Sequence, residues 1–274
     1  MVFHKLEGLG NDFVLFSEFD QLDFDFSKFR AVAPKLCDRR KGIGADGLLL
    51  LSQGDKADFT LKIINSDGSE AENCGNGLRC AALFARMKNL TSKKHFTIEP
   101  PAGIIPIEIL DNGEIKVKLG KARFDRAEIP VTGPPASELF GEKVRVENHD
   151  FELHAVNVGN PHCVIFTPLS YSEVCRFGPQ LETHPLFPRK INVEFVEVVD
   201  RKNLKVQVWE RGAGYTLACG TGATAVAATA CKKGLIDLPV KIELPGGVLT
   251  IEREGEDFFL TGPANLVFQG EINI

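Results

Sequence analysis

Two cysteines stand at the start of similar short motifs, far apart in the chain. Cys74 precedes Gly-Asn-Gly in ENCGNGLRCAALF (72–84), and Cys219 precedes Gly-Thr-Gly in LACGTGATA (217–225). An apolar, Ala-rich run follows each motif and predicts a buried helix that begins just after the cysteine. The N-terminus of a helix carries unpaired N–H groups and partial positive charge, which stabilise a thiolate. We therefore expect the pKa of both thiols to fall toward neutrality.

Two such thiols predict a specific chemistry if the helix N-termini enclose one pocket. One thiolate removes a proton from a carbon atom on one face, and the other thiol returns a proton on the opposite face, which inverts a stereocentre. A substrate carboxylate would accept hydrogen bonds from the N–H groups of Gly75, Asn76, Gly220 and Thr221, and these donors would stabilise the developing negative charge. One such motif is a weak signal, but its recurrence favours an acid–base pair.

Other short segments recur with the cysteine motifs, in the same order and at nearly constant separation. We infer two homologous halves related by pseudo-twofold symmetry. The matched segments are GLGNDFVLF (8–16) with NVGNPHCVIF (157–166), NCGNGLRCAALFA (73–85) with ACGTGATAVAATA (218–230), and PPAGIIPIEI (100–109) with LPGGVLTIER (244–253).

The elements that would position these motifs are strands around a central helix in each half, which gives an α/β or α+β class. Helices are expected over 77–89 and 222–234, where the second is apolar or small on nearly every side. Segment 120–150 is rich in Pro and Gly, shows little periodicity, and is the expected crossover between the halves. Strands are predicted from β-rich or alternating runs over 59–66, 95–100, 113–120, 191–200, 205–212 and 248–254.

Composition limits the classes of function. The chain has 274 residues, of which 43% are hydrophobic and 25% charged, and its net charge of −5 argues against nucleic acid or an anionic membrane as the main partner. The first residues lack the pattern of a signal peptide, so we expect a cytoplasmic protein. The seven cysteines are an odd number without a C-x-x-C pair, which fits neither a disulfide framework nor a zinc ribbon.

Several polar residues accompany the cysteines. Asn65 and Glu210 each end an expected strand nine residues before Cys74 and Cys219. The Glu210 carboxylate either forms an ion pair with Arg211 or serves a ligand. His162 and three asparagines could each be ordinary turn residues, but as a group they offer the donors and acceptors that a zwitterionic ligand requires. These asparagines are Asn11, Asn160 and Asn192.

The chain resembles the diaminopimelate epimerases along its whole length. The resemblance rests on GLGNDFV, RRKGIGADGLL, NSDGSEAENCGNG, GNPHCV, INVEF, ERGAGYTLACGTGA and LPGG. It implies interconversion of LL- and meso-diaminopimelate, in lysine and cell-wall precursor biosynthesis, by two thiols and without a cofactor or metal. It also implies two similar domains, each a mostly antiparallel sheet around a central helix, with limits of 1–118 plus 264–274 and 119–263, and an active site in the cleft between them.

The resemblance also assigns roles to single residues. Cys74 and Cys219 would be the catalytic thiols, His162 and Glu210 would set their pKa values, and Arg211 would hold the distal carboxylate of the substrate. Members are often homodimers, and Phe268 matches an aromatic residue that contributes to the dimer. The substrate-binding set would be Asn11, Asn65, Gly75, Asn76, Asn160, Asn192, Glu210, Arg211, Gly220 and Thr221.

Two positions depart from the family pattern, and three other functions stay open. Gly47 stands where many members have a substrate-contacting Gln, and Thr221 stands where Ser is common. One alternative is a racemase or epimerase of proline or hydroxyproline. The others are a thiol–disulfide redox protein that uses Cys74 and Cys219, which could form a disulfide, and an inactive amino-acid-binding module.

Overall fold

The computed structural model describes residues 1–21 and 25–273. The chain forms two compact units, Met1–Lys118 with Thr261–Ile274 (unit 1) and Leu119–Leu260 (unit 2). The chain returns to unit 1 at Thr261, three residues before the expected limit of 264. In the described ranges, no helix is long and apolar enough to cross a membrane.

Unit 1 is a mostly antiparallel arrangement of strands with two α-helices. β1 pairs with β2 and β18, β3 with β4, β4 with β5, and β6 with β7, all antiparallel, whereas β2–β3 and β4–β6 are parallel pairs. Its elements are β1 (Val2–Gly8), β2 (Asn11–Ser17), η1 (Glu18–Asp20), α1 (Ser27–Cys37), β3 (Gly47–Gln53), β4 (Phe59–Asn65), β5 (Glu70–Ala71), α2 (Gly75–Met87), β6 (His95–Glu99), β7 (Ile105–Ile109), β8 (Ile115–Lys121) and β18 (Asn265–Glu271).

Unit 2 has the same kind of arrangement. β10 pairs with β9 and β11, β12 with β13, β13 with β14, and β15 with β16, all antiparallel, whereas β11–β12 and β13–β15 are parallel pairs. Its elements are η2 (Arg126–Glu128), β9 (Phe140–Val146), β10 (His149–Asn157), β11 (Pro161–Ile165), α3 (Tyr171–Glu182), β12 (Asn192–Asp200), β13 (Asn203–Glu210), β14 (Gly214–Thr216), α4 (Gly220–Lys232), β15 (Val240–Leu244), β16 (Gly247–Glu254) and β17 (Asp257–Gly262).

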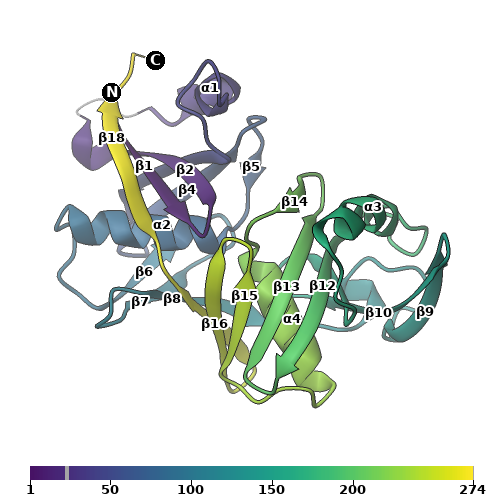
Figure 1. Ribbon diagram of the computed structural model, residues 1–274. Helices are drawn as coiled ribbons and strands as arrows, with labels where there is room; N and C mark the ends of the chain where they lie inside the picture. Colours follow the sequence, from purple (N-terminus) through teal and green to yellow (C-terminus); the bar gives the residue numbers. More distant parts are fainter. Residues whose placement is uncertain (22–24, 274) are drawn as a thin grey trace. The chain divides into compact units, whose positions relative to one another are not determined.

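The two units repeat one topology, as the sequence repeat predicts. The succession β1, β2, α1, β3, β4, β5, α2, β6, β7 has the same pairings and directions as β10, β11, α3, β12, β13, β14, α4, β15, β16. In unit 1 the last strand of the chain, β18, pairs with β1 as β9 pairs with β10 (Figure 1). The predicted fold class of two similar α/β domains is therefore confirmed.

The central helices are buried because almost every side chain on them is small or apolar. Within unit 1, α2 contacts strands β1 to β4, and its residues from Gly75 to Ala82 are all buried. Within unit 2, α4 contacts β10, β11, β12, β15 and β16, and Gly222 to Ala230 are buried (Figure 1). The expectation of helices wrapped by other structure is confirmed, since a helix apolar on all sides is stable only when it is covered.

Two features differ from the sequence expectation. Each unit has a second helix, α1 or α3, which links the two strands of a parallel pair, and neither was predicted. The capping box at Ser170 and Glu173 was a local signal for α3 that could have been used. In addition, segment 120–150 was expected to be a crossover of little regular structure, but it contains strand β9 (Phe140–Val146).

Candidate functional site

The first candidate thiol, Cys74, is the N-cap residue of α2. Its backbone is extended, with φ −153° and ψ 110°, and its sulfur accepts a hydrogen bond from the N–H of Gly77 at 3.4 Å. The sulfur thus does what a serine or aspartate oxygen does at an ordinary N-cap. The side chain stays half-buried, while Gly75 and Asn76 in the first turn are buried. The predicted helix start and the thiol position are confirmed.

The second candidate thiol, Cys219, caps α4 in the same way. Its backbone has φ −127° and ψ 112°, and its sulfur accepts a hydrogen bond from the N–H of Gly222 at 3.3 Å. The hydroxyl of Thr221 lies 3.4 Å from the sulfur. Unlike Cys74, Cys219 is buried, with 6% of its surface exposed. The two motifs therefore have one backbone geometry and two different degrees of burial.

The pKa of Cys219 differs from the value near neutrality that the sequence predicts. Burial raises the pKa of the Cys219 thiol well above its usual value, and the carboxylates of Glu210 and Glu194 raise it further. Hydrogen bonds from Thr221 and Gly222 lower the pKa but do not offset these effects. A pKa near neutrality was expected from the helix N-terminus alone, and this was wrong because burial and nearby carboxylates outweigh the helix terminus. Cys219 is thus a protonated thiol at neutral pH in this structure.

Asn11 lies beside Cys74 because of the β1–β2 hairpin. Leu9 and Gly10 connect the strands and have φ values of 59° and 84°, the left-handed conformation that a two-residue hairpin turn requires. Asn11, the first residue of β2, accepts a hydrogen bond from the Asn76 side-chain amide at 3.0 Å, and its Oδ1 lies 3.9 Å from the Cys74 sulfur. Unit 1 therefore brings Asn11, Cys74 and Asn76 together, as the sequence predicts.

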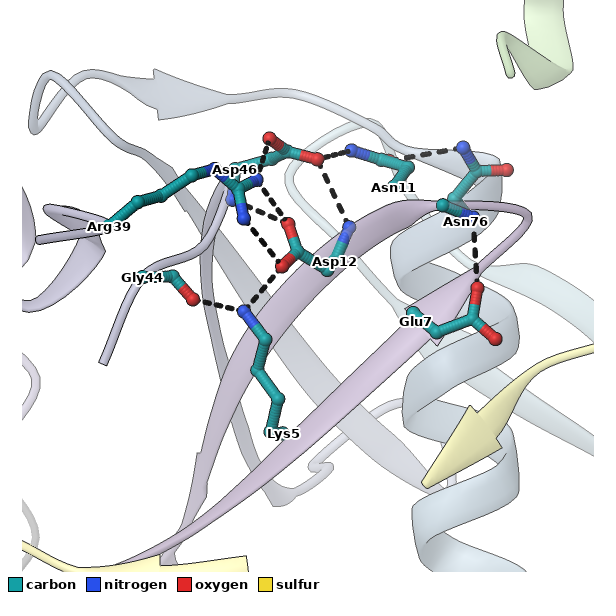
Figure 2. Close-up of polar contacts among 9 residues, drawn as sticks. Lys5, Glu7, Asn11, Asp12, Arg39, Gly44, Asp46 and Asn76 are labelled. Carbon is teal, nitrogen blue, oxygen red and sulfur yellow. Dashed lines mark hydrogen bonds and ion pairs between the residues drawn. The ribbon is translucent and has the colours of Figure 1, made fainter. Parts of the chain in front are cut away.

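A cluster of charged residues lies on the other side of Asn11 (Figure 2). The Asp12 carboxylate accepts two hydrogen bonds from Arg39, at 2.7 and 3.0 Å, and forms an ion pair with Lys5 at 2.5 Å. Lys5 also donates to the carbonyl oxygen of Gly44, and Arg39 donates to Asp46 at 2.7 Å. Burial opposes ionisation of Asp12, but the hydrogen bonds from Arg39 and Lys5 outweigh it and lower the pKa of Asp12 to about 2.

This cluster predicts a specific acid sensitivity. Since the pKa of Asp12 is lowered from 3.8 to about 2, its contribution to stability is complete above pH 3.8 and is lost as the pH falls through 2. The shift corresponds to about 2 kcal/mol. We expect the free energy of unfolding of the wild type to fall by about that amount more than that of Asp12→Asn between pH 5 and pH 2, as measured by urea unfolding. Equal losses would contradict this assignment.

In unit 2, a fully buried pair lies beside Cys219. Nδ1 of His162 donates a hydrogen bond to Oε1 of Glu194 at 2.6 Å, and both side chains are completely buried. Nε2 of His162 lies 2.8 Å from Oδ1 of Asn160. His162 contacts Glu194 because β11 and β12 are parallel neighbours. His162 and Glu210 were predicted to set the thiol pKa values. Glu210 raises the pKa of Cys219, whereas an effect of His162 stays a prediction.

Three further predicted residues lie around the end of β13. The carboxylate of Glu210 accepts a hydrogen bond from the Thr216 hydroxyl at 2.6 Å. Asn192 uses both ends of its side-chain amide, donating to the carbonyl of Pro161 at 2.7 Å and accepting from the N–H of Arg211 at 2.9 Å. Asn192 therefore holds the turn that carries Arg211, whose side chain is exposed.

Asn65 and Gly47 are neighbours on β4 and β3, where they are directly paired. Asn65 is the last residue of β4, as predicted, and its side chain donates to the Ser69 hydroxyl at 2.9 Å. A Cβ atom at Gly47 would lie 2.6 Å from the carbonyl oxygen of Ile64, which is too close for any side chain. The close approach of β4 thus accounts for glycine at position 47.

The glycines at the third helical position of the two motifs should respond differently to alanine. A Cβ at Gly222 would lie 2.8 Å from Oε1 of the buried Glu194, whereas at Gly77 it would meet a terminal methyl group of Leu49 at 3.0 Å. We expect Gly222→Ala to lower the free energy of unfolding by about 1–3 kcal/mol and Gly77→Ala by less, because the leucine can rotate aside. Urea unfolding of both variants tests this difference, and equal losses would count against it.

Two acidic residues of the site were missed in the sequence. Glu194 lies within the apolar strand sequence INVEF, and the cost of burying a carboxylate, which was applied to Glu210, could have identified it. Asp46 follows GIGA, and no local signal distinguishes it from a turn residue. All seven cysteines are free thiols, so a disulfide between Cys74 and Cys219 stays a hypothesis.

Comparisons with known proteins identify the family of this chain. The model of the family described as diaminopimelate epimerase matches residues 3–125 and 154–267. A protein of Carboxydothermus hydrogenoformans named diaminopimelate epimerase is 48% identical over 273 residues, covering 99% of both chains. A protein of the same name from Desulforudis audaxviator is 46% identical over 277 residues, again covering 99% of both.

Solved structures with low sequence identity share the fold. A phenazine biosynthesis protein of the PhzF family from Bacillus anthracis superposes with a TM-score of 0.74 at 16% identity, covering 100% of this chain and 99% of that one. A hydroxyproline epimerase from Agrobacterium vitis gives a TM-score of 0.71 at 13% identity, with coverage of 99% and 90%. From the family match and the full-length relatives, the chain belongs to the diaminopimelate epimerase family.

Proposed function

We propose that this chain is an isomerase that interconverts LL- and meso-diaminopimelate by proton transfer between Cys74 and Cys219. The family match and the relatives of the same name support the substrate and the reaction. The single structural observation that carries the mechanism is the pair of thiols that cap α2 and α4 with the same backbone geometry. Each sulfur accepts an N–H from its own helix, and this contact favours the thiolate form when the thiol gives up its proton.

The proposed reaction balances without a cofactor. A thiolate accepts the proton from the α-carbon, so that the C–H bond breaks and an S–H bond forms, and the electron pair stays on the carbanion. The other thiol then gives its proton to the opposite face of that carbon and becomes the thiolate. Which thiol acts as the base depends on the stereoisomer that binds, because each thiol acts on one face of the α-carbon.

The substrate contacts are proposed from the same positions. The first N–H groups of a helix have no partner inside the helix, so those of Gly75, Asn76, Gly220 and Thr221 suit the reacting carboxylate. The exposed guanidinium of Arg211 suits the distal carboxylate. We assign the amino groups and the remainder of the substrate to Asn11, Asn65, Asn160, Asn192 and Glu210.

Deuterium exchange tests the proposed substrate. Wild-type enzyme in D₂O is incubated with LL-diaminopimelate, and in parallel with L-proline and trans-4-hydroxy-L-proline, and the products are examined by mass spectrometry and chiral separation. We expect one deuterium at the α-carbon of diaminopimelate, with formation of the meso isomer. Deuterium that enters only the proline compounds would overturn the assignment in favour of a racemase of another amino acid.

We also propose a homodimer that involves the last strand. Leu266, Val267 and Phe268 on β18 are exposed by 36, 55 and 45%, which is unusual for consecutive apolar residues of a strand. Sedimentation of the wild type is expected to give a dimer, and Phe268→Glu is expected to shift it toward the monomer. A monomeric wild type at micromolar concentration would contradict this proposal.

A further inference from the structure

The Asp46 carboxylate is held from several sides next to Asn11 (Figure 2). Its Oδ2 accepts a hydrogen bond from the Asn11 side-chain amide at 2.7 Å and from the Asp12 backbone N–H at 3.0 Å. Its Oδ1 accepts from Arg39 at 2.7 Å. The Asp46 backbone N–H in turn donates to the Asp12 carboxylate at 3.1 Å. The position of this carboxylate is thus fixed by three donors from two segments, the start of β2 and Arg39.

This carboxylate determines how the Asn11 amide is turned. An ionised carboxylate can only accept hydrogen bonds, so the NH₂ group of Asn11 must face Asp46 and its oxygen must face the other way. On that other side, Oδ1 of Asn11 accepts from Asn76 at 3.0 Å and lies 3.9 Å from the sulfur of Cys74. A chain of hydrogen bonds therefore runs from Arg39 through Asp46 and Asn11 to the N-terminus of α2.

We propose that Asp46 is a positioning residue that keeps the oxygen of Asn11, and not its NH₂ group, toward Cys74. An oxygen atom beside the sulfur accepts from S–H and so favours the thiol, whereas an NH₂ group would donate to the thiolate and favour that form. The N-terminus of α2 lowers the pKa of the Cys74 thiol. Through Asn11, Asp46 opposes this effect and favours the protonated thiol. The inference rests on the proposed function only in giving Cys74 an acid–base role.

Other charged groups lie around this cluster and Cys74. Arg39 pairs with both Asp12 and Asp46, and Lys5 pairs with Asp12. Arg79 on α2 and Glu7 on β1 are further charged groups in this unit. Arg79 is fully buried and interacts electrostatically with Cys74 and Glu7. A variant at Asp46 therefore removes one carboxylate and leaves Arg39 paired with Asp12.

The counterpart of Asn11 in unit 2 is arranged by a different residue. Oδ1 of Asn160 lies 2.8 Å from Nε2 of His162, whose other nitrogen donates to Glu194. In both units an acidic residue therefore holds the asparagine at this matched position, directly in unit 1 and through a histidine in unit 2. This recurrence in the repeat favours a positioning role over a chance contact.

Alkylation of Cys74 by iodoacetamide, as a function of pH, tests the proposal without any substrate. The full chain is treated at each pH, and modification of the Cys74 peptide is quantified by mass spectrometry. In Asp46→Asn, the Asn11 amide can turn its NH₂ group to the sulfur, so we expect the pH midpoint of alkylation to fall by about one pH unit. The Asp46 side chain is 41% exposed, and loss of its charge alone should contribute little through the solvent.

A double-mutant comparison separates the Asn11 contact from the charge. In an Asn11→Ala background, Asp46→Asn should leave the midpoint almost unchanged, because the amide that transmits the effect is gone. Asp58→Asn is the matched control. Asp58 forms an ion pair with Lys93 in the same unit and lies just before the first residue of β4, at the end of that strand opposite Asn65. If Asp46→Asn loses the fold, Asp46→Ala gives the same expected shift.

Two results would overturn the proposal. One is an unchanged midpoint in Asp46→Asn, and the other is an equal shift in the presence and absence of the Asn11 side chain. Because no substrate is present, neither result depends on whether the chain epimerises diaminopimelate. A different combination of results would separate the two proposals. If no deuterium enters diaminopimelate but the pH midpoint of Cys74 alkylation falls in Asp46→Asn, the proposed function is rejected and the positioning role of Asp46 is kept.

Discussion

Replacing either candidate thiol by serine should lower the rate of epimerisation by about three orders of magnitude, which is the middle of the range for loss of a general acid or base. An alcohol is a far weaker acid than a thiol, so Ser at position 74 or 219 can neither form the base nor give up the proton at neutral pH. The measurement is the turnover of LL-diaminopimelate together with deuterium uptake at the α-carbon.

In each single variant, the thiol that is left should still exchange a proton on its own face of the substrate. If Cys74 and Cys219 act on opposite faces, each single variant should keep slow exchange from only one stereoisomer, while inversion is lost. Cys231→Ser is the matched control, because Cys231 lies on α4 outside the motif and is half-buried. Wild-type turnover in either Cys74→Ser or Cys219→Ser would refute the two-thiol mechanism.

Replacing Glu194 by alanine should lower the free energy of unfolding by about 3 kcal/mol. Glu194 and His162 are both fully buried, and removal of one partner leaves a buried polar group and a void. Glu194→Gln keeps the volume and an oxygen that can accept from His162, so we expect it to cost about 1 kcal/mol. Oε2 of Glu194 has no hydrogen-bond partner among the described residues, which further reduces the cost of losing the charge.

The glutamine variant should also change Cys219. Glu194 is one of the two carboxylates that raise the pKa of this thiol, so Glu194→Gln should lower that pKa. Urea unfolding measures the stability, and ultraviolet absorbance of the thiolate against pH, with Cys219→Ser as the reference, measures the ionisation. Glu197→Gln is the control, since Glu197 is exposed on the same strand. Equal stability of the alanine and glutamine variants would contradict the role of the buried hydrogen bond.

The fold was predictable from the sequence to the extent that its signals are local. The six predicted strands and both central helices form because their apolar periodicity and caps lie within short segments. Helices α1 and α3 were missed, although Ser170 and Glu173 carried a capping box. The segment with β9 was missed because strand formation there depends on pairing with β10, which follows it in the chain.

The sequence by itself determined the two thiol caps and the repeat, because Cys-Gly-x-Gly followed by an apolar run specifies a helix start without help from distant residues. Only the tertiary structure decided what surrounds the thiols. Asp46 reaches Asn11 over 35 residues and Glu194 reaches His162 over 32, in each case through a parallel strand pair that α1 or α3 connects. The pKa of Cys219 follows from such contacts and from burial, and this is why local sequence predicted its direction wrongly.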